Sequence, residues 1–160
     1  MGYTTEFSGS VRVEPPLNEA EIEFLNKFSD TRRMNRRKGP YYVDNAGMCG
    51  QDREPDIIDY NSPDPSQPGL WCQWVPTEDG TEIEWNGSEK FYDSPEWMQY
   101  LIDHFLRPGC KAASQLPFLQ ANHTVNGEID AEGEESGDIW RLVVTDNKVT
   151  VKQTRIVYDD

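Results

Sequence analysis

Segments in which apolar and polar residues alternate are the feature that most constrains how this chain can fold. Such alternation is typical of strands that bury one face, and it recurs over residues 3–13, 70–75, 81–85, 124–131, 139–145 and 148–158. A further short strand is predicted at residues 89–92, after the hairpin signal Asn86-Gly87. Only two segments have helical spacing, and the strands are grouped instead of alternating with helices. This order predicts an α+β fold, with an antiparallel sheet of about five to seven strands and both helices packed on one face.

Both predicted helices carry start signals. The first covers residues 18–30, where Asn18 and Glu21 form a capping box. The second begins with Ser94 as N-cap, has Pro95 in its first turn and ends at Pro108-Gly109. Its large side chains recur with helical spacing, at Trp97, Tyr100, Leu101, His104 and Phe105. These patterns predict two amphipathic helices.

Two long segments, residues 31–68 and 109–122, show no periodic pattern. A loop as long as the first is uncommon inside a compact domain, and it is usually either functional or disordered. Aromatic residues are scattered through residues 31–68, so we expect that loop to be ordered. With 160 residues the chain is long enough to bury one core, and we predict a single domain over residues 1–160.

The charge balance restricts the partners. The chain has 29 acidic and 15 basic residues, and its formal net charge is −14. An acidic surface repels phosphate groups, so we expect no direct binding to nucleic acid. The sequence shows no secretion signal and no apolar run long enough for a membrane span. We therefore predict a soluble cytoplasmic protein with no membrane partner.

The residues around Trp71 are predicted to form one strand of a hairpin. If residues 77–80 are its loop, Trp74 lies opposite Ile83 on the core side, and Gln73 lies opposite Glu84 on the outer side. Trp71 is also on the outer side, where the core does not require an indole. Two interpretations stay open: the loop of residues 31–68 covers this face as a second layer, or Trp71 is a stacking platform beside Gln73 and Glu84, which read the polar edges of a ligand.

A basic cluster interrupts the acidic chain. Five basic residues lie within seven positions: Arg32, Arg33, Arg36, Arg37 and Lys38. One interpretation is a solvated helix end, where cations are favourable. The other is an anion site, in which Arg32 and Arg33 bind a phosphate or carboxylate through their planar guanidinium groups.

An acidic run without any base follows near the C-terminus. It consists of Glu128, Asp130, Glu132, Glu134, Glu135 and Asp138. The spacing matches no EF-hand calcium loop, and alternating acids of this kind usually form a solvated strand edge. The run is also the best local support for an acidic module that imitates DNA toward a basic host protein.

Recognised catalytic motifs are absent from the sequence, so we predict no catalytic residues, no metal and no cofactor. Cys72 is expected on the core side, where thiols are usually unreactive. Cys49, Cys72 and Cys110 have the spacing of neither a disulfide framework nor a Cys-x-x-Cys site. An enzyme would be favoured if His104 or His123 lay in a cleft beside a carboxylate.

The chain resembles a family of small uncharacterised proteins of tailed bacteriophages and bacteria. The resemblance spans nearly the whole chain and is most specific in its central block. The segments that carry it include Thr31-Arg32-Arg33-Met34, Gly50-Gln51-Asp52, Asp59-Tyr60-Asn61, Gln67-Pro68-Gly69-Leu70-Trp71-Cys72-Gln73-Trp74, Thr77-Glu78-Asp79-Gly80 and Glu89-Lys90-Phe91-Tyr92. It implies a stand-alone protein linked to phages that acts on host physiology or defence, and it implies no particular activity.

These features lead to one hypothesis with two alternatives. The leading hypothesis is a non-enzymatic binder of a small anionic or nucleotide-like ligand. Its predicted site consists of Arg32, Arg33, Asp59, Tyr60, Trp71, Gln73 and Glu84. The first alternative is the acidic interaction module directed at a basic host protein, and the second is an enzyme of unknown class.

Overall fold

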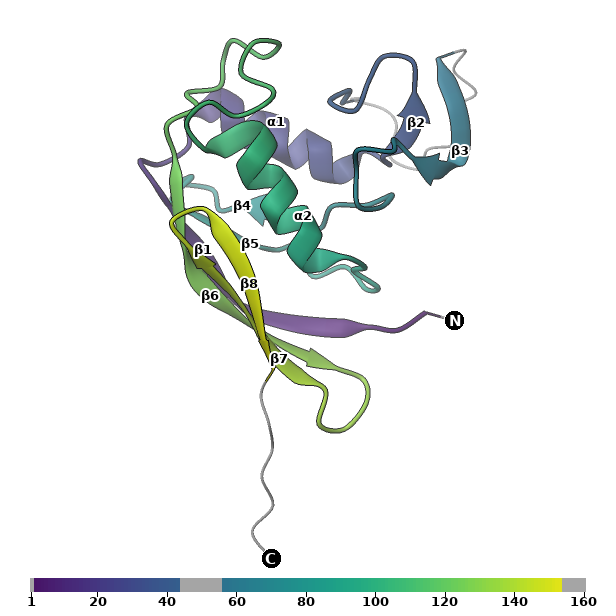
Figure 1. Cartoon of the computed structure of the whole chain (residues 1–160), viewed down its shortest axis with the longest axis vertical. Helices are drawn as coiled ribbons and strands as arrows, with labels where there is room; N and C mark the ends of the chain where they lie inside the picture. Colours follow the sequence, from purple (N-terminus) through teal and green to yellow (C-terminus); the bar gives the residue numbers. More distant parts are fainter. Residues whose placement is uncertain (1, 44–55, 154–160) are drawn as a thin grey trace, which may run out of the picture.

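The computed structural model describes residues 2–43 and 56–153, and within them it is an α+β fold (Figure 1). Its sheet has six antiparallel strands in the order β4-β5-β1-β6-β7-β8, and a separate hairpin pairs β2 with β3. The strands are β1 (Thr5–Glu14), β2 (Met34–Arg36), β3 (Ile57–Pro63), β4 (Trp74–Pro76), β5 (Glu82–Trp85), β6 (Thr124–Gly133), β7 (Ile139–Thr145) and β8 (Lys148–Gln153). The predicted fold class and strand number are confirmed.

Both helices contact the sheet and lie on the same side of it (Figure 1). Helix α1 (Glu19–Asp30) packs near β4, and helix α2 (Ser94–Leu101) packs near β8 and continues into a π-helical turn, η1 (Ile102–Leu106). The predicted capping box is present, because the Asn18 side chain accepts from the Glu21 N–H and the Glu21 carboxylate accepts from the Asn18 N–H. At α2 the residue before the helix is Asp93, so the helix begins one position earlier than Ser94 as N-cap predicts.

Aromatic rings fill the space between the helices and the sheet. Phe28 of α1 meets Trp97 and Phe105 edge to face, with ring centroids 5.9 and 5.1 Å apart, respectively. Edge-to-face pairs of this kind stabilise a core beyond their burial alone. Trp74 and Trp97 are fully buried, as the sequence predicts, whereas Trp85 is half-buried at the edge of the core.

The centre of the sheet is the long pairing of β1 with β6. At Gly127, the two strands leave little room for a side chain. Gly127 lies opposite Val11 and has φ +147°, a backbone conformation that side chains rarely adopt. A Cβ at this position would lie 2.9 Å from the Val11 Cα and 3.2 Å from the Ser10 carbonyl oxygen. Because both neighbours are backbone atoms of a central strand, they cannot move aside cheaply.

We therefore expect Gly127→Ala to lower the free energy of unfolding by about 2–3 kcal/mol. The matched control is Gly137→Ala, where φ is +85° but no atom lies within 4 Å of the added Cβ, and where only the backbone penalty of about 1 kcal/mol applies. Urea unfolding followed by tryptophan fluorescence measures both. Equal losses in the two variants would show that the close approach to β1 is not the cause.

Four details of the predicted strands are wrong. The segment of residues 31–68 was predicted to be an irregular loop, but it contains β2 and β3. The strand predicted over residues 70–75 is only Trp74–Pro76, and residues 89–92 form no strand. The hairpin of β4 and β5 pairs Trp74 with Trp85 and Val75 with Glu84, two residues away from the predicted register.

Asp79 explains the register of that hairpin. Its carboxylate accepts hydrogen bonds from the Thr81 hydroxyl and N–H and from the Thr77 hydroxyl, and these bonds lower its pKa to about 2. The Thr77 N–H in turn donates to the Glu82 carbonyl. The loop is therefore centred one residue later than predicted, while Trp74 and Ile83 remain on the buried side.

No helix in the described part of the chain is long and apolar enough to cross a membrane.

Candidate functional site

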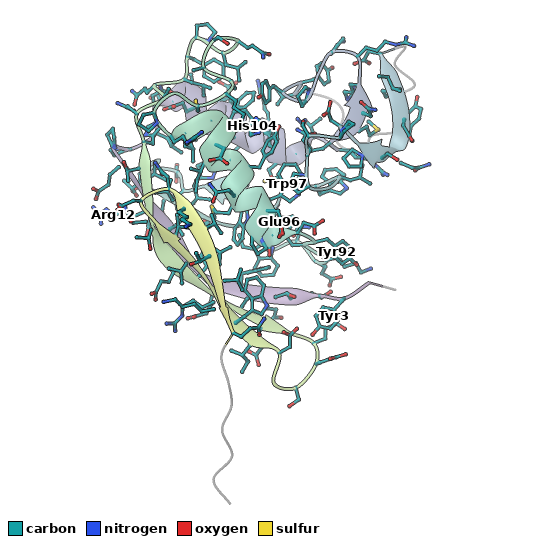
Figure 2. The ribbon with its side chains drawn as sticks, viewed as in Figure 1. Tyr3, Arg12, Tyr92, Glu96, Trp97 and His104 are labelled. Carbon is teal, nitrogen blue, oxygen red and sulfur yellow. The ribbon has the colours of Figure 1, made fainter. Side chains whose placement is uncertain are left out.

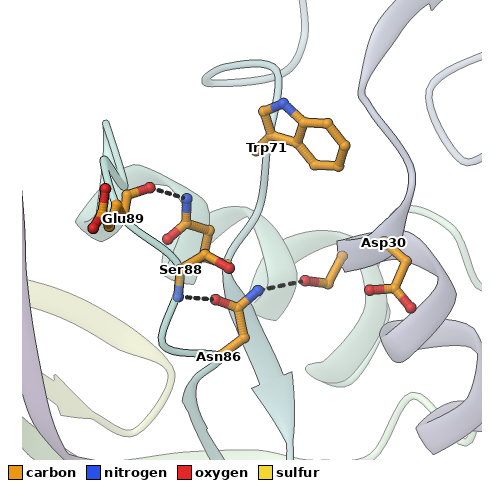
Figure 3. Close-up of a pocket in the computed structure, with 7 residues that line it drawn as sticks. Asp30, Trp71, Asn86, Ser88 and Glu89 are labelled. Atoms are coloured by element: carbon orange, nitrogen blue, oxygen red, sulfur yellow. Dashed lines mark hydrogen bonds between the residues drawn. The ribbon is translucent and has the colours of Figure 1, made fainter. Parts of the chain in front are cut away.

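A groove runs past Trp71, between the C-terminal end of α1 and the loop that joins β5 to α2 (Figure 3). It consists of two adjoining cavities of about 450 and 480 Å³ that share Trp71, Gln73 and Glu89. We call it the Trp71 groove. One end is lined by Ser29, Asp30, Asn86 and Ser88, and the other by Pro63, Pro68, Gly69, Leu70, Lys90, Tyr92 and Asp93.

Trp71 is positioned by its neighbours in the chain. The Leu70 carbonyl accepts from the Arg33 N–H at 2.7 Å, and the Cys72 carbonyl accepts from the Ser29 hydroxyl at 2.7 Å. Cys72 points into the core with 1% exposure, and burial raises the pKa of its thiol to about 12. Trp71 itself stays half-buried and lines both cavities, one of which it shares with Asp30 and Ser88 (Figure 3). The backbone is thus tied down on both sides of a ring that the core does not enclose.

Gln73 holds in place the side of the groove that faces α1. Its amide oxygen accepts from the Trp85 Nε1–H at 3.1 Å, and its amide nitrogen donates to the Glu89 carbonyl at 3.0 Å. Gln73 is buried, with 7% exposure, and Glu84 lies opposite Val75, so the predicted pairing of Gln73 with Glu84 is wrong. Both hydrogen-bond partners of its amide group lie in β5 or in the loop after it. Gln73 therefore holds this loop in place beside the groove.

The polar end of the groove combines a helix end with a turn. Asp30 is the last residue of α1 and is exposed. Across from it, the Asn86 side chain accepts from the Ser88 N–H at 2.9 Å and donates to the Ser29 hydroxyl at 3.4 Å. These contacts place carboxylate, amide and hydroxyl groups around one side of the Trp71 ring (Figure 3).

The other end is more apolar and contains two unusual features. Lys90 and Asp93 both have left-handed backbone, with φ 61° and 57°, and such residues often cluster at functional sites. The Trp97 Nε1–H lies beneath Gly69, which lines the groove. It is a buried donor without a hydrogen-bond partner. A Cβ on Gly69 would lie 3.6 Å from that nitrogen and 3.9 Å from an Asp93 carboxylate oxygen. Unsatisfied buried donors are rare in proteins and call for an explanation.

Of the seven predicted site residues, the structure brings only Trp71 and Gln73 together in the groove. Asp59 and Tyr60 lie on β3, both are exposed, and Asp59 accepts from the Asn61 N–H. Glu84 is exposed on β5, opposite Ser10 of β1 and Val75 of β4. None of these three lines the groove.

The two predicted arginines also lie elsewhere. Arg33 is 3% exposed, and its guanidinium donates to the carbonyls of Thr31 and Pro40 at 3.1 and 3.0 Å and to the carbonyl of Tyr42. It also lies over the Phe28 ring, 4.2 Å from the centroid, and burial lowers its pKa to about 10. Arg32 is half-buried, and its Nε is buried without a hydrogen-bond partner. Neither arginine is among the residues that line the groove.

Neither histidine lies in the groove. His104 lies in η1 (Figure 2), is 9% exposed and stacks on Tyr100, and the Tyr41 hydroxyl lies 2.7 Å from its Nδ1. Burial lowers the pKa of His104 to about 4, so the ring is neutral at pH 7 and accepts from Tyr41. His123 is fully buried and contacts the Glu21 carboxylate, away from any of the described cavities. In the described residues no group of three or more His, Cys, Asp or Glu side chains could hold a metal ion.

The acidic run near the C-terminus has ordered partners within the fold. Arg141 contacts Asp130 at 2.8 Å and Glu128 at 3.4 Å, and the Tyr3 hydroxyl donates to Asp138 at 2.6 Å. These contacts break up the charge strip on which the DNA-mimic alternative depends. That alternative stays a prediction.

Sequence reasoning missed the polar end of the groove. Asp30 was visible only as the end of a predicted helix, and Asn86 and Ser88 only as a turn signal. Their position near Trp71 follows from the packing of α1 against β4, which no local pattern reveals.

Comparisons of the chain with profiles of known protein families, with curated proteins and with solved structures find no match. The groove must therefore be interpreted from its own chemistry.

Proposed function

We propose that this protein is a non-enzymatic binder of a small ligand with a flat, nucleobase-like ring, which stacks on Trp71 in the Trp71 groove. The observation that carries the proposal is the Trp71 indole itself. It is half-buried, its backbone is anchored on both sides, and it forms a wall of two cavities. Their volumes lie within the range of about 300–1,000 Å³ that is usual for small-molecule sites.

The polar groups around the ring support a ligand with hydrogen-bonding edges. Asn86, Ser88 and Asp30 lie on one side of the indole and offer both donors and acceptors. The unpartnered Nε1–H of Trp97 lies one layer beneath the opposite end. An aromatic wall with a few polar groups at its ends is the usual composition of a small-molecule site.

The chemistry of the lining does not favour catalysis or a phosphate group. Within residues 2–43 and 56–153, those that line the groove include no histidine and no cysteine, and their only base is Lys90. Arg33, the best candidate for binding a phosphate, uses its donors on backbone carbonyls. We therefore retain the flat ring of the predicted nucleotide-like ligand and not its anionic group.

Isothermal titration with adenosine, guanosine, cytidine, uridine and indole tests the proposal. We expect at least one of them to bind, and Trp71→Ala to weaken that binding about tenfold or more, because base–aromatic stacking contributes roughly 1–3 kcal/mol. Tyr60→Ala is the matched control, since Tyr60 is an exposed aromatic residue outside the groove.

Far-ultraviolet circular dichroism would show that both variants keep their fold. If none of the five compounds binds at millimolar concentration, or if the Trp71 and Tyr60 variants weaken binding equally, the proposed function is wrong.

A further inference from the structure

We infer that the ligand of the Trp71 groove is a small organic cation, whose charged group lies beside Asp30 and whose apolar body crosses Trp71 toward Leu70 and Tyr92. The inference rests on the proposed function, because it names the class of ligand for the same groove. It reverses the sign of charge that the basic cluster of residues 32–38 suggested.

The charge at the polar end of the groove is negative. Asp30 and Glu89 line this end, and no lysine, arginine or histidine is among the described residues that line it. Asp30 is also the last residue of α1, and the C-terminal end of a helix carries a partial negative charge from its carbonyl groups. Lys27, the base in the last helical turn, contacts Glu23 at 3.0 Å. A cation is therefore the ligand group that this end of the groove attracts.

The opposite end of the groove differs in charge and polarity. Here Lys90 balances one of the carboxylates, and Asp93 precedes the N-terminus of α2, whose partial positive charge it offsets. Pro63, Pro68 and Leu70 make the rest of this wall apolar. The gradient from Asp30 to Leu70 orients the ligand, with its charge at the α1 end and its apolar body at the other.

Trp71 joins the two ends and suits a cationic ligand. Its indole lines both cavities, and indole is the ring that attracts a nearby cation most strongly. The carboxylates are exposed, so each one contributes modestly and its effect is screened by salt. The two cavities have the volume of a small-molecule site, which favours a free amine over the side chain of a macromolecule.

Three indole derivatives that differ only in charge test this inference. They are tryptamine, tryptophol and indole-3-propionate, which carry an ammonium, a hydroxyl and a carboxylate group on the same ring. In titrations at low salt we expect tryptamine to bind about tenfold more tightly than tryptophol, and indole-3-propionate to bind most weakly. The advantage of tryptamine should shrink at 0.5 M salt, whereas the affinity of tryptophol should change little.

A pair of matched variants locates the charge. Asp30→Asn should weaken tryptamine binding about fivefold and leave tryptophol unchanged, because it removes the negative charge at the polar end only. Asp146→Asn makes the same chemical change outside the groove, in the turn between β7 and β8, and we expect less than a twofold effect on either compound. Asparagine tolerates the left-handed backbone of Asp146, where φ is 46°, so the control keeps the local conformation.

The outcomes separate this inference from the proposed function. If the three derivatives bind equally, or if Asp30→Asn leaves tryptamine binding unchanged, the ligand is not a cation although the groove is a binding site. If no compound binds at all, both conclusions fail. If a lysine-containing tripeptide with blocked ends binds more tightly than tryptamine, the inference of a free small molecule is wrong and a basic peptide takes its place.

Discussion

Replacing Glu21 with alanine is expected to lower the free energy of unfolding by about 3–5 kcal/mol, because it leaves the His123 imidazolium buried without its counter-ion. Both side chains are fully buried. The His123 Nε2 lies 2.9 Å from one Glu21 carboxylate oxygen and 3.1 Å from the other, and its Nδ1 lies 2.7 Å from the Pro15 carbonyl oxygen. The Nδ1 faces a carbonyl oxygen and donates to it, and a protonated Nε2 donates to the Glu21 carboxylate, so the imidazolium form satisfies both partners.

The substitution removes more than the ion pair. The Glu21 carboxylate also accepts from the backbone N–H groups of Asn18 at 2.9 Å and Gln120 at 3.1 Å. It thereby connects the start of α1 with the loop of residues 109–122 and with the residue before β6. Loss of this one side chain removes the acceptor of three donors, and of these the fully buried His123 Nε2 is the most costly to leave unsatisfied.

Glu23→Ala is the matched control. Glu23 lies in the same helix and forms an exposed ion pair with Lys27, so its loss should cost less than about 0.5 kcal/mol. Urea unfolding at pH 6 measures both variants. A loss below 1 kcal/mol for Glu21→Ala would contradict a charged pair in the core.

The dependence of stability on pH gives a second readout for the same pair. Burial acts against the charged form of both groups, but the pKa of Glu21 is lowered by hydrogen bonds from His123, Asn18 and Gln120, and the pKa of His123 is raised by its hydrogen bonds to Glu21 and Pro15. The His123 contribution is complete below its ordinary pKa of 6.5 and is lost as the pH rises through its raised pKa. The Glu21 contribution is complete above its ordinary pKa of 4.5 and is lost as the pH falls through its lowered pKa.

The difference in stability between the wild type and Glu21→Ala should therefore be largest between about pH 5 and 6 and should shrink on both sides. A difference that stays constant from pH 4 to pH 9 would mean that the pair is not ionised.

Glu21 also shows what local patterns can and cannot reveal. Its place in a capping box was predictable, because that motif depends on two residues three positions apart. Its contact with His123 joins residues 102 positions apart, and no local spacing records such a contact. The predicted strands over residues 3–13, 124–131 and 139–145 are confirmed for the same reason as the capping box, since alternation is a local property.

The hairpin of β2 and β3 was missed because it has no such local sequence pattern. Its residues are largely polar, and the pairing of Met34 with Pro63 and of Asn35 with Asp59 is interrupted by shifts in register. Pairing of this kind leaves no alternation to detect. The residue before β2 is fixed by a distant segment, because the Arg33 N–H donates to the Leu70 carbonyl.

The sequence was informative about some residues of the candidate site and uninformative about others. The sequence left open whether Trp71 is covered or forms part of a site, and its predicted outward position depended on a strand that does not reach residue 71 in the structure. The indole is half-buried. The partners of the arginine side chains could not be predicted from the sequence. An arginine that binds a phosphate and an arginine that binds backbone carbonyls occur in the same kind of sequence. Only the packing of residues 40–42 around Arg33 distinguishes the two.

Replacing Arg33 with lysine is expected to lower the free energy of unfolding by about 2–4 kcal/mol, although the charge is retained. The planar guanidinium donates to three carbonyls at once and lies over the Phe28 ring, which an ammonium group cannot reproduce. The carbonyls of Thr31, Pro40 and Tyr42 would be left partly unsatisfied in a buried place. Urea unfolding measures the loss, and Arg12→Lys is the matched control, since Arg12 is exposed and pairs with Glu14 on the surface.

The same pair of variants decides between the two interpretations of the basic cluster. If Arg33 were free to bind an anion, Arg33→Lys would change stability no more than Arg12→Lys, and a titration with inorganic phosphate would lose its signal in the Arg33 variant alone. We expect instead a large difference in stability and no phosphate signal in either protein. The Arg33 pKa of about 10 keeps its charge at neutral pH, so this cation acts as the internal support for the segment that leads into the Trp71 groove.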